Sequence, residues 1–220
     1  MHNNVIITIS RQYGSNGKEI GRKLAEYLDI GYYNKEIMEK IAIDMGIDPH
    51  FFSGTDKNDL GLYTLPEGHG SFSTMAELSV NSKVYEMAES FIKGISERES
   101  AVIVGRCADY ILRENKKCIS VFFYSDIEDR VRWSIKEYHV PEKKAHKLVL
   151  EKDKQRAGFY EFYTNQHWGQ ARNYDIMINT SKMKEEEIIE MLSSLYDAKA
   201  GIVQMKGAFE NQYIQEKDRG

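Results

Sequence analysis

The feature that most constrains the fold is a strand, a glycine-containing loop and a helix in succession over residues 5–28. Val5–Ile9 is a short apolar run rich in β-branched side chains, which is typical of a strand buried on both faces of a parallel sheet. Apolar residues then recur at helical spacing as far as Leu28. Between the two, Gly14 and Gly17 allow backbone angles that other residues avoid. A loop that leads into a helix N-terminus presents backbone N–H groups to an anion, so the arrangement predicts a phosphate-binding loop.

The loop matches the phosphate-loop pattern G-x-x-x-x-G-K-[ST] only in part. Gly17 and Lys18 are in place, but Gln12 stands at the first glycine position and Glu19 at the position of the hydroxyl that binds Mg²⁺. A carboxylate there can still bind a metal ion, or it can repel a triphosphate. The alternative interpretation is that the glycines serve only the tight packing of a turn. The residues predicted to bind phosphate are Gly14, Ser15, Asn16, Gly17, Lys18 and Glu19.

The composition of the whole chain limits the classes of protein to which it can belong. No apolar run approaches the roughly 20 residues that span a membrane, and residues 1–4 lack the pattern of a signal peptide. The net charge of −4 argues against a general nucleic-acid-binding protein. The two cysteines, Cys107 and Cys118, suggest no disulfide framework and lack the spacing of a zinc site. We therefore expect a cytoplasmic protein with small-molecule partners and no membrane or nucleic-acid partner.

Strand-like and helix-like segments alternate along the chain, which predicts the class of fold. The five candidate strands cover residues 5–9, 31–33, 101–105, 118–124 and 175–179. Such alternation predicts an α/β fold, a doubly wound and mostly parallel five-stranded sheet with helices on both faces. Ligands of such sheets bind beyond the carboxyl ends of the strands.

The segments between the strands are predicted as helices or loops. Asn34 caps a helix to about residue 45, and a second long helix covers about 74–97. Residues 54–73 are irregular, which is typical of either a functional loop or a disordered one. Ser125 and Glu128 have the spacing of a capping box at the start of a further helix. Pro141 suits the first turn of the next helix.

A basic segment within that last helix predicts a set of cations for a phosphate. Lys152, Lys154 and Arg156 can close over phosphate groups as a lid, and we predict Lys18, Lys154 and Arg156 as the catalytic cations. The alternative is an ordinary solvated helix face. The aromatic residues of 158–163 and Trp168 are expected in loop-like segments, either meeting a nucleotide base or packing on the core.

Arginines elsewhere are further candidates for binding a phosphate. Arg106 directly follows a buried strand, and its guanidinium group can bind a substrate phosphate through two parallel hydrogen bonds. The alternative is an ion pair between Arg106 and Asp109. Arg130 and Arg132 are additional basic candidates, with surface ion pairs as the alternative. The acid that phosphate-loop enzymes often carry at the end of the 101–105 strand is missing.

Five segments, in this order, resemble the cytidylate kinase-like proteins of bacteria. They are Ser10–Ala25, Val102–Arg106, Val121–Arg132, Lys152–Arg156 and Tyr174–Ser181, and the resemblance extends to about residue 196. It implies the P-loop nucleoside monophosphate kinase fold, with a core sheet, a mobile helical lid and an acceptor-binding region. It also implies ATP and Mg²⁺ as cofactors. We expect a single domain over residues 1–206, with an acceptor-side insertion at about 46–98 and a lid at about 141–170, followed by a poorly ordered tail at 207–220.

The resemblance also implies roles for individual residues. It assigns Gly14, Ser15, Gly17 and Lys18 to the donor phosphates, Arg156 to the lid, and Arg106 to the acceptor, with Asp109 and Arg11 as further acceptor candidates. Two positions depart from the cytidylate kinases themselves. Cys107 replaces an aspartate that helps those enzymes to hold the acceptor, and Glu19 replaces the metal-binding hydroxyl.

Three hypotheses about function follow. The first is an ATP-dependent phosphotransferase that acts on a nucleoside monophosphate such as CMP or dCMP. The second keeps the fold but phosphorylates another small metabolite, which Cys107 favours. The third is a nucleotide-binding sensor without catalysis, which Glu19 and the missing acid favour.

Overall fold

The computed structural model describes residues 4–38 and 75–201, with side chains from Tyr85 onward in the second range. The predicted insertion, the irregular segment 54–73, most of the helix predicted from Asn34 and the tail 207–220 lie wholly or partly outside these ranges. Within them, Asn34 Oδ1 accepts a hydrogen bond from Ile37 N at 2.9 Å, as expected of a helix cap.

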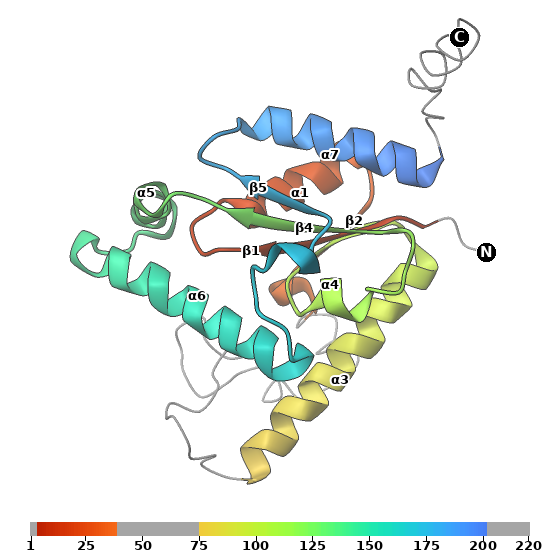
Figure 1. Cartoon of the computed structure of the whole chain (residues 1–220), viewed down its shortest axis with the longest axis horizontal. Helices are drawn as coiled ribbons and strands as arrows, with labels where there is room; N and C mark the ends of the chain where they lie inside the picture. The colour runs from red at the N-terminus through yellow and green to blue at the C-terminus, as the bar shows by residue number, and fades with distance from the viewer. Residues whose placement is uncertain (1–3, 39–74, 202–220) are drawn as a thin grey trace, which may run out of the picture.

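The centre of the molecule is a five-stranded parallel sheet (Figure 1). Its strands are β1 (Ile6–Arg11), β2 (Gly31–Tyr33), β3 (Ala101–Val104), β4 (Cys118–Tyr124) and β5 (Ile176–Asn179). The order across the sheet is β2-β3-β1-β4-β5, and every pair is parallel. The predicted fold class is therefore confirmed. Because β1 lies between β3 and β4, the loops that follow these three strands meet at one edge of the sheet.

Helices cover both faces of the sheet. On one face lie α1 (Gly17–Leu28) and α7 (Glu185–Ala200), and on the other lie α3 (Met75–Arg98) and the short α4 (Ala108–Ile111) (Figure 1). Two apolar clusters match these two faces, because alternate residues of β1 point to opposite sides. Ile7 and Ile9 belong to the α1 and α7 cluster, whereas Ile6 belongs to the α3 and α4 cluster.

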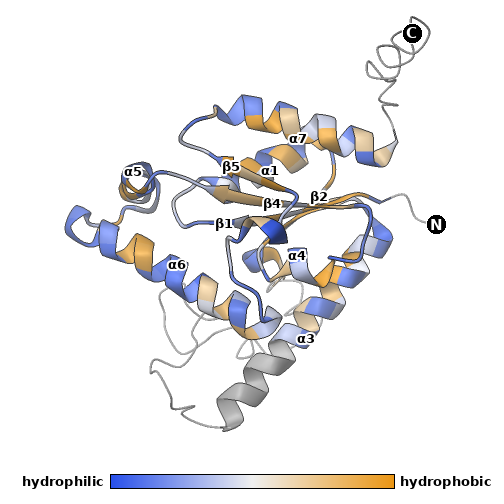
Figure 2. Cartoon of the chain, in the orientation of Figure 1, coloured by the Kyte–Doolittle hydropathy of each residue, from blue (hydrophilic) through white to orange (hydrophobic). Residues whose placement is uncertain are grey.

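The helix α5 (Ile127–Tyr138) lies beyond the carboxyl ends of the strands. From that end α6 (Glu142–Thr164) runs beneath the sheet on the side of α3 and α4 (Figure 1), and the short 3₁₀ helix η2 (Ala171–Asn173) follows. Hydrophilic and apolar patches alternate along α6, whereas β5 is largely apolar (Figure 2). Within the described ranges, no helix combines the length and the apolar character that a membrane crossing requires.

Two local predictions are wrong. Residues 158–163, predicted as loop-like, continue α6, because Phe159 and Tyr160 are buried and pack in an aromatic cluster that fixes the helix. Ser125 does not close a capping box: α5 begins after Asp126, and the Ser125 hydroxyl lies 2.7 Å from that of Ser181. The Ser125 hydroxyl therefore contacts a residue distant in sequence, Ser181, and does not cap the backbone of α5.

Candidate active site

The loop between β1 and α1 has a conformation that its glycines make possible. Gly14 has φ +78° and Asn16 has φ +61°, both in the left-handed region. A Cβ atom at Gly14 would lie 2.5 Å from the carbonyl oxygen of Arg130, and one at Gly17 would lie 2.8 Å from the ring of Phe123. Both glycines are therefore needed for packing as well as for the shape of the loop.

Several backbone N–H groups of this loop are left without an acceptor. The N–H groups of Gln12, Tyr13 and Ser15 donate hydrogen bonds inside the protein. Among the described residues there is no acceptor for the N–H groups of Gly14, Asn16, Gly17 and Lys18. A group of amides at a helix N-terminus has the geometry to donate hydrogen bonds to an anion, which makes this loop a candidate anion site.

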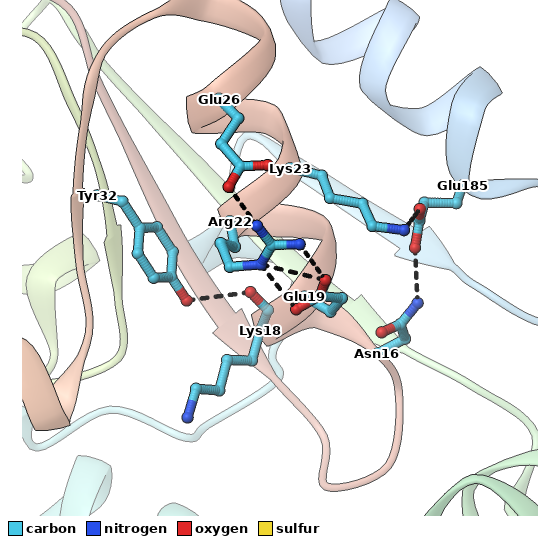
Figure 3. A network of polar contacts seen from close by, with 8 residues as sticks. All are labelled: Asn16, Lys18, Glu19, Arg22, Lys23, Glu26, Tyr32 and Glu185. Carbon is cyan, nitrogen blue, oxygen red and sulfur yellow. Dashed lines mark hydrogen bonds and ion pairs between the residues drawn. The ribbon is translucent and has the colours of Figure 1, made fainter. Parts of the chain in front are cut away.

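Lys18 lies in the first turn of α1, and its side chain lines neither the pocket beside the loop nor the small cavity after β3. Its Nζ donates to Glu36 Oε1 at 2.8 Å, and its carbonyl accepts from the Tyr32 hydroxyl at 3.1 Å; Figure 3 shows Tyr32 and Lys18. Burial alone would raise the pKa of Glu36, but the hydrogen bond from Lys18 and the charges of Lys18 and Arg11 outweigh it and lower that pKa. Both side chains of the pair are about half exposed, so an anion at the loop can compete with Glu36 for the ammonium group.

Glu19, the possible metal ligand, is occupied by a neighbour on α1. Its carboxylate accepts from Arg22 Nε at 3.0–3.1 Å, and Arg22 also binds Glu26 (Figure 3). The hydrogen bond from Arg22 is the main reason that the pKa of Glu19 is lowered. No cluster of three potential metal ligands occurs among residues 4–38 and 75–201. The described residues therefore do not form a cage for Mg²⁺, an ion that binds largely through water and substrate phosphates.

Segments distant in sequence hold the loop in place. The Thr180 hydroxyl, after β5, donates to the Ser15 carbonyl at 2.9 Å. Glu185, in the first turn of α7, accepts from Asn16 Nδ2 at 3.0 Å and pairs with Lys23 (Figure 3). The loop is thus fixed before any ligand binds, which reduces the ordering cost of binding.

A pocket of about 510 Å³ lies beside the loop. It extends from Gly14 to Trp133 on α5 and to Thr180 and Ser181 after β5. Arg132, one of the additional basic candidates, lines this pocket and forms an ion pair with Asp129, as the alternative interpretation predicted. Its volume is typical of pockets that hold a small organic ligand.

The loop after β3 forms a second, much smaller cavity. Gly105, Arg106 and Cys107 all have positive φ, at 81°, 60° and 54°. Arg106 is only 5% exposed and lines a cavity of about 20 Å³ together with Arg11 and Arg156. Phe159, Tyr160 and Trp168 close it. The cavity has room for one water molecule but not for a phosphate group.

Asp109, a predicted acceptor residue, is buried beside this cavity. Its carboxylate accepts from the Tyr160 hydroxyl at 2.7 Å and from the Ser10 hydroxyl at 3.3 Å. Burial raises the pKa of Asp109 to about 6, despite these hydrogen bonds. Burial also raises the pKa of the neighbouring Cys107 thiol, which therefore stays neutral.

The helix α6 is attached to the phosphate loop. Asp153 Oδ1 accepts from Tyr13 N at 2.7 Å, and its other oxygen pairs with Arg130, which is buried rather than at the surface. Arg156 donates to the Arg11 carbonyl at 3.0 Å and lies over the Tyr13 ring. Lys152 and Lys154 line neither cavity, and Lys154 is exposed.

The sequence interpretation missed the residues that make this attachment. Asp153 lies inside the basic segment 152–156, in which the cations are the conspicuous residues. Tyr160 is one of several aromatic residues in 158–163. A single carboxylate among cations on a predicted lid is a sign that this carboxylate binds something. Its partner is a backbone amide some 140 positions away, which the spacing of residues in the sequence does not reveal.

Comparison with solved structures supports the same fold. An uncharacterized protein from Eubacterium ventriosum matches with 28% identity and a TM-score of 0.67, over 88% of this chain and 99% of that one. Shikimate kinase from Bacteroides thetaiotaomicron matches with 13% identity and a TM-score of 0.50, over 88% and 98%. The second likeness shows the fold alone, which is that of P-loop kinases.

Comparison with curated proteins found no match. The model of the cytidylate kinase-like family matches residues 6–182, a span that includes the phosphate loop, the loop after β3 and the whole of α6. The chain therefore belongs to the cytidylate kinase-like family.

Proposed function

We propose that the protein transfers the γ-phosphate of ATP to a nucleoside monophosphate, with CMP and dCMP as the first acceptors to test. The observation that carries this proposal is the loop between β1 and α1. Its four backbone N–H groups without an acceptor and the Lys18 ammonium supply the donors and the positive charge that a polyphosphate requires.

The pocket beside the loop suits the nucleoside part of ATP. Trp133 gives it a flat apolar surface, and Thr180 and Ser181 contribute hydroxyl groups at its opposite side. A base held there lies next to the phosphate loop, so one ligand can occupy both. The family membership and the P-loop kinase fold support a nucleotide as the ligand.

The three arginines around the smaller cavity suit the phosphate of an acceptor and the transferred group. Arg11, Arg106 and Arg156 approach from β1, the loop after β3 and α6, so they surround a point between the carboxyl ends of two adjacent strands. Phosphoryl transfer depends mainly on positioning and on cations around the moving group. Since the cavity holds only a water molecule, an acceptor requires α6 or Trp168 to move outward. Magnesium, when bound with the nucleotide, neutralises phosphate charge.

A different small-molecule acceptor is the second candidate, and Cys107 favours it. The thiol is buried and neutral, so it does not replace the carboxylate that stands at this position in cytidylate kinases. The Asp109 carboxylate nearby is already hydrogen-bonded to Ser10 and Tyr160.

The test is ADP formation by the purified protein with Mg·ATP and a panel of nucleoside monophosphates. Lys18→Ala is the diagnostic variant, and Lys143→Ala, an exposed lysine on α6 outside both cavities, is the matched control. We expect turnover with at least one monophosphate, a loss of roughly 10²–10³-fold in Lys18→Ala, and no change in the control. The free energy of unfolding of Lys18→Ala should change by less than about 1 kcal/mol, because an exposed ion pair contributes little.

Each result decides between the hypotheses. Turnover with CMP or dCMP supports a cytidylate kinase that works with Cys107 and Glu19, and turnover with another monophosphate changes only the acceptor. ATP binding without turnover on the whole panel excludes the nucleoside monophosphate acceptor and leaves another metabolite or a sensor. If ATP neither binds nor raises the melting temperature, the phosphate loop serves packing only and the proposal is wrong.

A further inference from the structure

A second polar pocket lies away from the phosphate loop. Its volume is about 380 Å³, and it is formed by α4 and the turn that follows it, by η2 and by the end of α7. Its floor includes Cys118 and Ser120, in the amino-terminal half of β4. The phosphate loop follows the carboxyl end of β1, which is parallel to β4, so the two sites are at opposite ends of the sheet.

Four basic side chains surround this pocket: Arg113, Lys116, Arg172 and Lys199. Three of them, Lys116, Arg172 and Lys199, form no ion pair with any carboxylate of the described ranges. Arg113 donates to the Tyr110 carbonyl at 2.7 Å and lies over the Tyr110 ring, and its one carboxylate neighbour among the described residues is Glu114, at 3.8 Å and 91% exposed. This pattern contrasts with α1, where Lys18, Arg22 and Lys23 each have a carboxylate partner.

The carboxylates at this pocket already have donors of their own. Asp175 Oδ2 accepts from the backbone N–H and the hydroxyl of Ser120, at 2.8 and 2.9 Å. Asp109 is buried and accepts from Tyr160 and Ser10. The four basic groups therefore exceed the acids that line the pocket, in a chain whose net charge is −4.

Amide groups add neutral donors to the same walls. Asn115, Gln166 and Asn173 line the pocket, and Asn173 Nδ2 is held by the His167 carbonyl at 2.9 Å. The Lys199 ammonium donates to the Lys116 carbonyl at 2.8 Å, which holds it at the rim. Charged and amide donors around an open volume of this size match the acceptor oxygens of a phosphate group.

We infer that this pocket is a second anion site, which binds a small molecule carrying phosphate groups. The inference does not depend on the proposed function, because none of the residues of the phosphate loop lines this pocket. Tyr160 also lines the small cavity after β3, but this pocket and the pocket beside the phosphate loop share no lining residue, so binding of an anion here is expected to be separable from nucleotide binding.

The test is isothermal titration calorimetry of the full chain with inorganic pyrophosphate, in a magnesium-free buffer of low ionic strength. The background is Lys18→Ala, which weakens the phosphate loop. In that background, Arg172→Gln with Lys199→Gln should weaken pyrophosphate binding roughly tenfold or more, since each charge-assisted hydrogen bond is strong. Lys143→Gln with Lys144→Gln, which removes the same charge from the exposed surface of α6, should leave the affinity unchanged.

Two additions keep the test decisive. Arg172→Glu alone changes an exposed residue that forms no side-chain hydrogen bond in the described structure, so it gives a second reading if the double variant is unstable. Raising the salt concentration should weaken the remaining binding, as expected for partly exposed charges. Equal affinity in the double variant and its control, or no binding in the Lys18→Ala background, would overturn the inference. If Lys18→Ala binds as much pyrophosphate as the wild type, Lys18 does not contribute to pyrophosphate binding and the second pocket accounts for it.

Discussion

The loops after β1 and β3 leave the same edge of the sheet, yet they differ in what they leave accessible. The loop after β1 has four backbone N–H groups with no acceptor among the described residues and a half-exposed lysine, beside a pocket of about 510 Å³. The loop after β3 also has left-handed residues, but its Arg106 is 5% exposed and its cavity is about 20 Å³.

The difference arises from α6 rather than from the loops themselves. Phe159 and Tyr160 of this helix cover the loop after β3, whereas on the loop after β1 the helix contacts one side only, through Asp153 and Arg156. The loop after β1 is therefore formed in advance and accessible, whereas the loop after β3 is covered. Under the proposed function the first is the donor side and the second the acceptor side, where an acceptor requires movement of the cover. The following predictions separate the two sides.

The largest expected effect is on the acceptor side. Arg106→Met keeps much of the side-chain volume but removes the guanidinium group, so turnover should fall by roughly 10²–10³-fold, as for the loss of one transition-state donor. ATP should still raise the melting temperature, because the phosphate loop and its pocket are unchanged. Initial rates and thermal shift measure the two effects. A variant that loses ATP binding together with turnover would contradict the separation of the two sides.

The next effect concerns the packing of the loop after β1. Gly14→Ala and Gly201→Ala carry nearly the same dihedral penalty, since their φ angles are +78° and +76°. A Cβ at Gly14 would lie 2.5 Å from the Arg130 carbonyl oxygen, whereas one at Gly201 would meet no atom of the described residues within 4 Å.

Gly201→Ala should therefore lower the free energy of unfolding by about 1 kcal/mol, and Gly14→Ala by about 3 kcal/mol or more. Urea unfolding measures both. Equal losses in the two variants would mean that the loop after β1 relaxes freely and is not held in advance.

The smallest effect concerns the pH dependence of stability on the acceptor side. The pKa of Asp109 is about 6 in the folded protein and 3.8 for an ordinary aspartate, mainly because of burial. Below pH 3.8 the group is protonated in both states. Between about pH 4 and 6 it ionises first in the unfolded chain, so folding stability falls as pH rises, by at most about 3 kcal/mol.

Asp109→Asn should remove this loss, because the amide oxygen can still accept from Tyr160 and no charge forms. The variant should gain about 1–2 kcal/mol relative to the wild type between pH 4 and pH 7, measured by urea unfolding at each pH. Comparing the two proteins cancels the other carboxylates. If the difference in free energy of unfolding between the two proteins stays constant across this range, Asp109 ionises with its ordinary pKa. Water would then reach the carboxylate despite its burial in the structure.

The fold could be predicted because its signals are local. The strand at residues 118–124 coincides with β4, and 175–179 differs from β5 by one residue, because apolar runs between turns record burial on both faces. Local sequence patterns gave wrong predictions where a side chain contacts a residue distant in sequence. Ser125 has the spacing of a capping box, yet its hydroxyl contacts Ser181, and the aromatic residues of 158–163 stay helical because they pack against other elements.

The candidate site could be predicted only in part, for the same reason. The loop that carries Gly14, Gly17 and Lys18 is predictable because strand, loop and helix are consecutive in the sequence. The role of Asp153 is not, because its contact with Tyr13 joins segments 140 positions apart. The four basic residues of the second pocket extend from 113 to 199, so only the folded chain brings them together.

The sequence by itself determined the parallel sheet, the phosphate loop and the residues at the ends of the central strands, because burial patterns and glycine positions act over a few residues. The tertiary structure alone decided which of these groups are accessible. It buried Arg106 and Cys107 beneath α6, and it left four amides of the phosphate loop without an acceptor among the described residues. Exposure and charge state depend on what packs against a group, and the packing partners are distant in sequence.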